Sequence, residues 1–151
     1  MSDLQVSRRA QIDSFVAMDV MAEANRRDAA GEDIIHMEIG QPASPAPEQA
    51  RQAVREALDS GAHGYTDAPG LPALRQRIAR YYAERHAVEV APERIIVTTG
   101  SSAGFSLAFL MLFDQGGAPG LPQPGYPCYR HIASALGLRP VAVEAGPAEQ
   151  W

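Results

Sequence analysis

The sequence predicts an α/β protein, because short β-branched segments alternate along the chain with longer segments of helical periodicity. Glycine or proline stands at most of the transitions between them. Only two or three strands of a main sheet are visible, and one predicted helix is apolar almost all round. Such a helix needs cover on every side, so we expect this chain to be part of a larger fold.

The first 46 residues are expected to form an N-terminal helical arm and a connector. Residues 8–30 carry an apolar stripe at helical spacing, and residues 34–39 form a short strand-like run. The segment 41–47 is rich in proline, which suits neither a helix interior nor a central strand. We therefore expect it to lead, in extended form, into a main domain at residues 47–151.

Within this main domain, the predicted helices begin at proline or serine and carry apolar residues at helical spacing. The predicted helices cover 47–60, 72–86, 102–113 and 127–136, and the predicted strands cover 95–99 and 140–144. The second helix should turn one set of side chains inward, namely Leu74, Ile78, Tyr81 and Tyr82. The third helix is the apolar one and is too short to span a bilayer.

Composition excludes several classes of function. The chain is 46% hydrophobic and 21% charged, as expected for a soluble globular protein. Its net charge of −5 argues against nucleic-acid binding, and no membrane span, secretory signal or metal-spaced cluster is visible. The single Cys128 rules out an internal disulfide and fits a reducing cytoplasm, where we expect the protein to reside.

A phosphate seat is indicated at Gly100, Ser101 and Ser102, where a β-branched strand breaks at glycine into the apolar helix. The first turn of a helix leaves backbone N–H groups without intrahelical partners and carries positive dipole charge. Two hydroxyls beside them favour an anion such as phosphate. The alternative is that Ser101 or Ser102 caps the helix, and this segment alone does not decide between the two.

Two further loops carry tyrosines. In the segment 122–129, three prolines around Gly125 form a rigid turn that would present Tyr126 as a flat face for a planar ring. Taken alone, packing of that tyrosine in a core is the better interpretation. The loop 64–70 presents Tyr65 and by itself reads as an ordinary glycine and proline loop.

Together and in this order, these motifs resemble the class I/II aminotransferases, which use pyridoxal 5'-phosphate (PLP) and have fold type I. The resemblance runs from about Ile12 to the end of the chain. The matching stretches are MEIGQP, GYTDAPGLPALR, ERIIVTTGSSAGFSLAF and LPQPGYPCYR. It implies the N-terminal portion of the PLP-binding large domain, an incomplete α/β/α sandwich preceded by the helical arm.

The resemblance also implies roles for single residues. Gly40 corresponds to the backbone position that faces the substrate carboxylate, and Tyr65 to the tyrosine that reaches the PLP phosphate of the partner subunit. Tyr126 corresponds to the aromatic side chain that stacks on the pyridine ring. The phosphate-binding turn corresponds to Gly100, Ser101 and Ser102.

No catalytic residue can be assigned, because the family's Schiff-base lysine is absent: all 13 basic residues other than histidine are arginine. Guanidinium stays protonated and cannot act as a nucleophilic amine. We therefore expect residues 1–151 alone to be inactive and to bind PLP weakly or not at all. The full-length parent is expected to be a homodimer.

The sequence departs from the family after the apolar helix. Relatives usually read Gly-Asp-x-Val there, whereas this chain reads Gly-Gly-Ala-Pro-Gly at residues 116–120. Either the following strand starts late, near Leu121, or it is weakened, and this affects how the Tyr126 side chain is oriented.

In the family, the strand that corresponds to residues 95–99 pairs with a strand from later in the chain. We therefore expect residues 1–151 to be poorly stable on their own.

The predicted function is that of an aminotransferase fragment, whose parent moves an amino group from an amino acid to a 2-oxo acid. One alternative keeps the fold but changes the reaction to that of a carbon–sulfur lyase or a decarboxylase. Another is a non-catalytic remnant, or a module that binds a full-length subunit through Tyr65 and the arm. A free-standing phosphate- or nucleotide-binding domain is weaker, because it leaves Tyr65 and Tyr126 unexplained.

Overall fold

The computed structural model describes residues 5–61 and 64–149, so His63 of the predicted loop and Trp151 lie outside the described residues. Contacts divide the chain into unit 1, residues 1–39 and 99–151, and unit 2, residues 40–98. The sequence predicted a different boundary, with an N-terminal arm at residues 1–46 and a main domain from residue 47, and that boundary stays a prediction.

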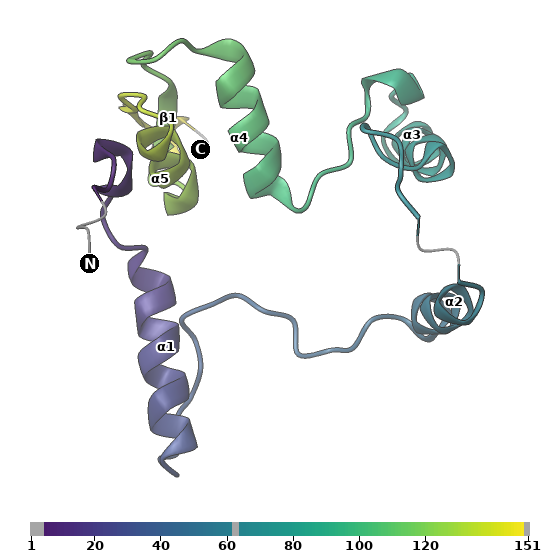
Figure 1. The fold of residues 1–151 in the computed structure, drawn as a ribbon, viewed down its shortest axis with the longest axis horizontal. Coiled ribbons are helices and arrows are strands. Elements are labelled where there is room, and N and C mark those ends of the chain that lie inside the picture. Colours follow the sequence, from purple (N-terminus) through teal and green to yellow (C-terminus); the bar gives the residue numbers. More distant parts are fainter. Residues whose placement is uncertain (1–4, 62–63, 150–151) are drawn as a thin grey trace. The chain divides into compact units, whose positions relative to one another are not determined.

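In chain order the elements are η1 (Arg8–Ala10), α1 (Val16–Ala29), α2 (Glu48–Asp59), α3 (Pro72–His86), η2 (Pro92–Arg94), α4 (Ser101–Leu112), β1 (Gly120–Gln123), α5 (Pro127–Ala135), β2 (Val141–Glu144) and η3 (Pro147–Glu149) (Figure 1).

Unit 1 contains two short parallel strands connected through α5. β1 pairs with β2 from Gly120 opposite Val141 to Gln123 opposite Glu144. Parallel strands need a crossover connection, and α5 provides it. α4 and α5 pack together beside the strands. The buried core of the unit consists of Phe109, Ala133 and Leu138, surrounded by the partly buried Phe105, Phe113, Leu121, Ile132 and Leu136.

The glycine-rich segment before β1 forms a turn that is closed by residues far along the chain. Gly116 N–H donates to the Gly137 carbonyl at 3.0 Å, and Arg139 N–H donates to the Gly117 carbonyl at 2.8 Å. Pro119 cannot donate, but its carbonyl accepts from Val141 N–H at 2.9 Å. Of the two outcomes that the sequence left open, the late start of the strand is therefore the observed one.

The four helices predicted for the main domain are confirmed with ends that differ by one residue at most, and the strand predicted at 140–144 is observed as β2. Three other predictions are wrong. The arm helix begins at Val16 rather than at residue 8, because Phe15 leaves the helical conformation and packs against α5. Residues 34–39 and 95–99 form no strand among the described residues, because no neighbouring ladder satisfies their backbone groups there.

Large apolar side chains remain exposed on most helices. The prediction that four side chains of α3 face inward is wrong. Leu74, Tyr81 and Tyr82 are exposed, and of the four only Ile78 is half-buried. Within unit 2, the element that packs on α3 is the short η2, which is too small to cover that face. α4 shows the same shortage of cover, with exposed side chains at Leu107, Leu110, Met111 and Leu112.

Within unit 2, a tight approach at Gly70 joins the loop before α3 to the segment around Val97. This glycine is buried and has a φ of +100°, and a Cβ added to it would lie 2.7 Å from Cβ of Val97. Val97 N–H in turn donates to the Pro69 carbonyl at 2.9 Å. Arg75 of α3 adds a second link through its Nε, which donates to the carbonyls of Pro92 at 3.0 Å and Ile95 at 2.9 Å.

We expect Gly70→Ala to loosen unit 2. The left-handed conformation costs a non-glycine residue about 1–2 kcal/mol, and the clash with Val97 adds to this cost. Hydrogen exchange at the Val97 amide should therefore become at least about tenfold faster. Gly64→Ala is the matched control, because an added Cβ there meets no atom within 4 Å. Equal exchange rates in both variants would contradict the expectation.

Candidate cofactor site

The predicted phosphate seat is a glycine turn that opens α4. Gly100 is the N-cap residue, with a φ of +86° that favours glycine, and both serines already lie inside the helix. The interpretation in which a serine caps this helix is therefore wrong. α4 carries no charged side chain along its length, so no carboxylate of its own competes for its positive end.

The second serine of this turn is tied to the neighbouring helix. Ser102 Oγ lies 3.4 Å from Cys128 Sγ, and both side chains are half-buried. Each is the second residue of its helix, so the contact joins the N-terminal turns of α4 and α5. Ser106, one helical turn further on, instead donates to the Ser102 carbonyl at 2.9 Å.

Tyr126 stands at the start of α5, held by a turn that requires glycine. A Cβ on Gly125 would lie 2.3 Å from the Pro122 carbonyl oxygen, and the Gln123–Pro124 peptide bond is cis. The Tyr126 ring meets Tyr129 at 5.3 Å and Phe15 at 6.1 Å, with interplanar angles of 78° and 79°. Neither neighbour stacks in parallel on Tyr126, and 52% of the residue is exposed.

The aromatic contacts continue from Tyr126 into α4. Tyr129 lies against Phe105 with ring centroids 3.8 Å apart, and Phe15 also packs against His131 at 5.6 Å. The ring of Tyr126 is therefore braced from the N-terminal arm on one side and from the α4–α5 contact on the other. Neither Phe15 nor Tyr129 was singled out from the sequence, although both are aromatic and Tyr129 lies within the proline-rich motif.

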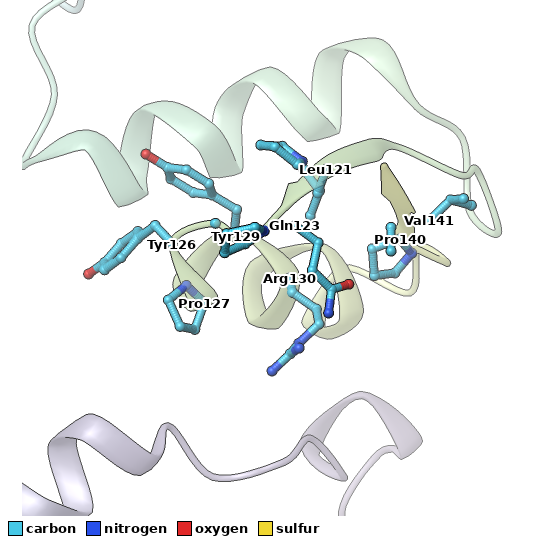
Figure 2. A pocket seen from close by; sticks show the side chains of 12 residues that line it. Leu121, Gln123, Tyr126, Pro127, Tyr129, Arg130, Pro140 and Val141 are labelled. Carbon is cyan, nitrogen blue, oxygen red and sulfur yellow. The ribbon is translucent and has the colours of Figure 1, made fainter. Parts of the chain in front are cut away.

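A pocket of about 320 Å³ opens beside this turn (Figure 2). The end of β1, the proline turn and the start of β2 form its walls. Tyr126 and Pro127 lie at one end of it and Pro140 and Val141 at the other, with Tyr129 between them. The pocket thus gives an approach to one side of the tyrosine turn.

The other predicted site residues belong to unit 2. Tyr65 is fully exposed, and no atom lies within 4 Å of the position that a Cβ on Gly40 would take. The structure brings the serine turn and the Tyr126 turn together through Ser102 and Cys128. The roles of Tyr65 and Gly40 stay predictions.

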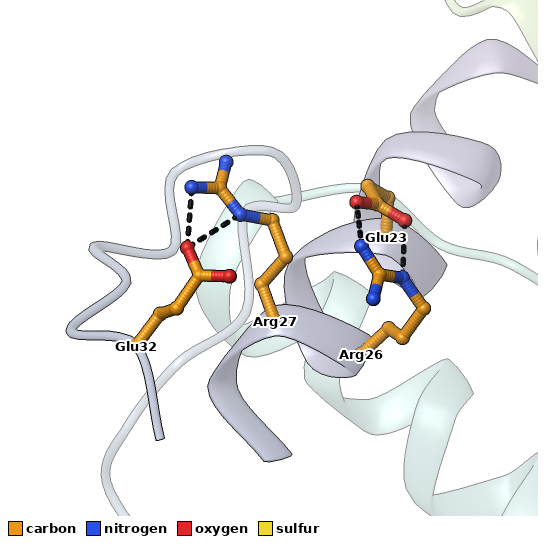
Figure 3. A network of polar contacts seen from close by, with 4 residues as sticks. All are labelled: Glu23, Arg26, Arg27 and Glu32. Carbon is orange, nitrogen blue, oxygen red and sulfur yellow. Dashed lines mark hydrogen bonds and ion pairs between the residues drawn. The ribbon is translucent and has the colours of Figure 1, made fainter. Parts of the chain in front are cut away.

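The N-terminal arm carries several exposed ion pairs. Arg26 pairs with Glu23 and Arg27 with Glu32 at the exposed end of α1 (Figure 3), and the hydrogen bond from Arg26 lowers the pKa of Glu23. Further along, His36 Nδ1 lies 2.8 Å from Glu38 Oε1, which raises the pKa of the imidazole. Exposed ion pairs contribute little to stability, and none of these touches the serine or tyrosine turns.

Two other kinds of site find no support in the part of the chain that the structure describes. No three histidine, cysteine or acidic side chains gather there as metal ligands would. No helix within residues 5–61 and 64–149 has the length and hydropathy needed to cross a bilayer.

Comparison with known proteins decides the family. The profile for aminotransferase class I and II matches residues 32–151. The chain belongs to the class I and II aminotransferases. Valine–pyruvate aminotransferase of Mycobacterium tuberculosis is 44% identical over 143 residues, which are 95% of this chain and 37% of the relative. A transaminase from Methanocaldococcus jannaschii, which acts on (5-formylfuran-3-yl)methyl phosphate, is 34% identical over 89% of this chain and 36% of its own length.

Solved aminotransferases share the fold. A crystal structure of an aminotransferase from Mycobacterium tuberculosis matches with a TM-score of 0.89 and 43% identity, over 96% of this chain and 38% of that one. Alanine aminotransferase from Pyrococcus furiosus matches with a TM-score of 0.86 and 29% identity, over 97% and 38%. The predicted partial fold type I large domain is confirmed, and the chain spans somewhat more than a third of these relatives.

The family implies PLP, and two features of this chain fit that cofactor. The turn that opens α4 carries the hydroxyls of Ser101 and Ser102, and α4 itself contains no acidic side chain, which suits a phosphate dianion. The half-exposed ring of Tyr126, whose contacts with Phe15 and Tyr129 are both edge-on, suits a planar pyridine. The chain contains no lysine, so the fit covers the phosphate and the ring but no covalent anchor.

Proposed function

We propose that this chain supplies the phosphate seat and the ring contact of a PLP-dependent aminotransferase. The parent enzyme moves an amino group from an amino acid to a 2-oxo acid. The observation that carries the proposal is the Ser102–Cys128 contact, which places the serine turn beside the tyrosine turn in a chain of this family. When bound, PLP serves as an electron sink that allows the amino acid to lose its α-proton.

The residues of this chain would bind and orient the cofactor. The first-turn N–H groups of α4 and the hydroxyls of Ser101 and Ser102 would donate to the phosphate, with the helix dipole favouring its charge. Tyr126 would fix the plane of the ring, because Phe15 and Tyr129 hold its own ring edge-on. Without a lysine, this binding is noncovalent and weak, on the order of a millimolar Kd.

Substrates and partners of the whole protein are part of this proposal. The similar proteins named above include a valine–pyruvate and an alanine aminotransferase, so they support an amino acid and a 2-oxo acid as substrates without selecting one pair. Gly40 would face the substrate carboxylate through its backbone. Tyr65, which is fully exposed, would reach the phosphate of the partner subunit in a homodimer.

Binding of pyridoxine 5'-phosphate, an aldehyde-free analogue of PLP, tests the proposal. Equilibrium dialysis at millimolar concentrations should detect it, and Tyr126→Ala should weaken it about twofold to tenfold, as the loss of one aromatic stacking contact of about 0.5–1.5 kcal/mol predicts. Tyr126→Phe should retain it, since the stacking face is kept. Tyr81→Ala, which removes another exposed tyrosine, is the matched control. Equal affinities in all four proteins would refute the ring contact.

A further inference from the structure

The pocket beside the proline turn combines apolar walls with a small number of polar groups. Four prolines, the rings of Tyr126 and Tyr129 and aliphatic side chains of β1 and β2 line it. Two of its side chains end in nitrogen-bearing groups, the amide of Gln123 and the guanidinium of Arg130, and both extend to the same side of the turn (Figure 2). An apolar hollow with a few polar groups is the usual form of a small-molecule site.

The walls of this pocket are fixed by the backbone. A proline ring holds its own φ near −65°, and the turn between β1 and α5 is so tight that a Cβ on Gly125 would lie 2.3 Å from the Pro122 carbonyl oxygen. The strands are held in register, with Leu121 opposite Ala142. A ligand would therefore enter a hollow that is already formed, which reduces the entropy lost on binding.

Arg130 gives the pocket a positive charge that no acidic side chain neutralises. Within residues 5–61 and 64–149, no ion pair involves its guanidinium. β1, α5 and β2 contain a single acidic residue, Glu144, which does not line the pocket. Glu144 stands opposite Gln123 in the sheet, so it would repel a second negative charge on a ligand. The charges thus favour an anion with one negative charge over a phosphate dianion.

The size of the pocket limits what it can hold. At the roughly 30 Å³ that a water molecule occupies in the liquid, a volume of about 320 Å³ corresponds to about ten non-hydrogen atoms. A carboxylate suits the planar guanidinium of an arginine, because two parallel N–H groups can donate to its two oxygens. The rest of such a ligand would have to be apolar, because proline and aliphatic side chains surround it.

We propose that this pocket binds a small apolar monocarboxylate, with the carboxylate at Arg130 and Gln123 and the apolar body between the proline turn and the start of β2. The proposal does not depend on bound PLP. Arg130 lies outside the serine turn and the Tyr126 ring contact, so the two sites can be tested by different variants.

The first experiment titrates residues 1–151 with 4-fluorobenzoate, which has ten non-hydrogen atoms, and follows its ¹⁹F NMR signal. A ligand of this size should bind with a Kd on the order of a few millimolar. Arg130→Gln should weaken binding about threefold to tenfold, because a charge-assisted hydrogen bond at a partly exposed site is lost. Arg80→Gln is the matched control, since it removes an exposed arginine of α3 in unit 2, and it should leave the Kd unchanged.

The second experiment separates the charge from the apolar contact. 4-Fluorobenzamide has the same ring without the negative charge, so it should bind the wild-type chain more weakly than the acid does. It should bind Arg130→Gln and the wild-type chain equally, which also shows that the variant keeps its pocket. In ¹H–¹⁵N spectra, 4-fluorobenzoate should shift the amide signals of Leu121 and Ala142 in the pocket wall and leave that of Val97 in unit 2 unmoved.

The results distinguish this proposal from the proposed cofactor site. Equal 4-fluorobenzoate affinity in the wild-type chain and Arg130→Gln, or shifts confined to residues outside the pocket, would overturn the carboxylate site. Neither result affects the phosphate seat, which is tested by pyridoxine 5'-phosphate and Tyr126→Ala. Conversely, failure of pyridoxine 5'-phosphate to bind, together with binding of 4-fluorobenzoate that depends on Arg130, would refute the cofactor site and support the carboxylate site.

Discussion

Residues 1–151, supplied with PLP, an amino acid and a 2-oxo acid, should transfer no amino group faster than PLP does in protein-free buffer. Enzymes accelerate their reactions at least about a millionfold, and we expect all of that acceleration to be missing. The reason is chemical, because the chain contains no lysine to carry the cofactor and shuttle its proton. Arginine cannot take over, since its guanidinium is always charged.

The measurement follows transfer of a ¹⁵N-labelled amino group by NMR or mass spectrometry. The full-length valine–pyruvate aminotransferase of Mycobacterium tuberculosis serves as the positive control for the assay. A rate above the protein-free level that disappears in Tyr126→Ala would contradict the expectation, because it would locate real catalysis at the proposed site. The expected result restricts this chain to binding and orientation, which is the part of the chemistry that its residues can perform.

Local patterns predict the helices of this chain well. α3 begins at Pro72 and ends at His86 as its periodicity indicates, because proline at the first turn and apolar residues at helical spacing act within a few residues of each other. The segment 95–99 shows the opposite case. Its β-branched residues favour a strand, but a strand also needs a neighbour, and propensity cannot provide one.

The candidate site likewise has features that local sequence predicts and features that depend on tertiary packing. The glycine turn before α4 could be predicted because a β-branched segment, a glycine and two serines stand next to each other in sequence. The orientation of Tyr126 could not, because it depends on Phe15 at the other end of the chain. The Ser102–Cys128 contact likewise depends on how α4 packs on α5. The sequence of one helix does not predict which other helix it packs against.

That packing should be abolished by a single change, Ala133→Asp. Ala133 is fully buried, with 0% of its surface exposed, in the core between α4 and α5. A carboxylate there would be taken out of water into an apolar core, which costs several kcal/mol. The core of unit 1 consists of three buried residues, so a cost of that size should exceed the stability of the unit.

Hydrogen exchange gives the most direct reading of this change, because the Leu138 amide donates to the Ala133 carbonyl at 2.9 Å. In Ala133→Asp we expect this amide to exchange at the rate of an unfolded chain and the analogue of PLP to lose its binding. Ala118→Asp adds the same charge at an exposed position of the turn before β1 and should leave both nearly unchanged. Protection of Leu138 that survives in Ala133→Asp would mean that α5 holds its place without α4. The serine turn and the tyrosine turn would then form their halves of the site independently.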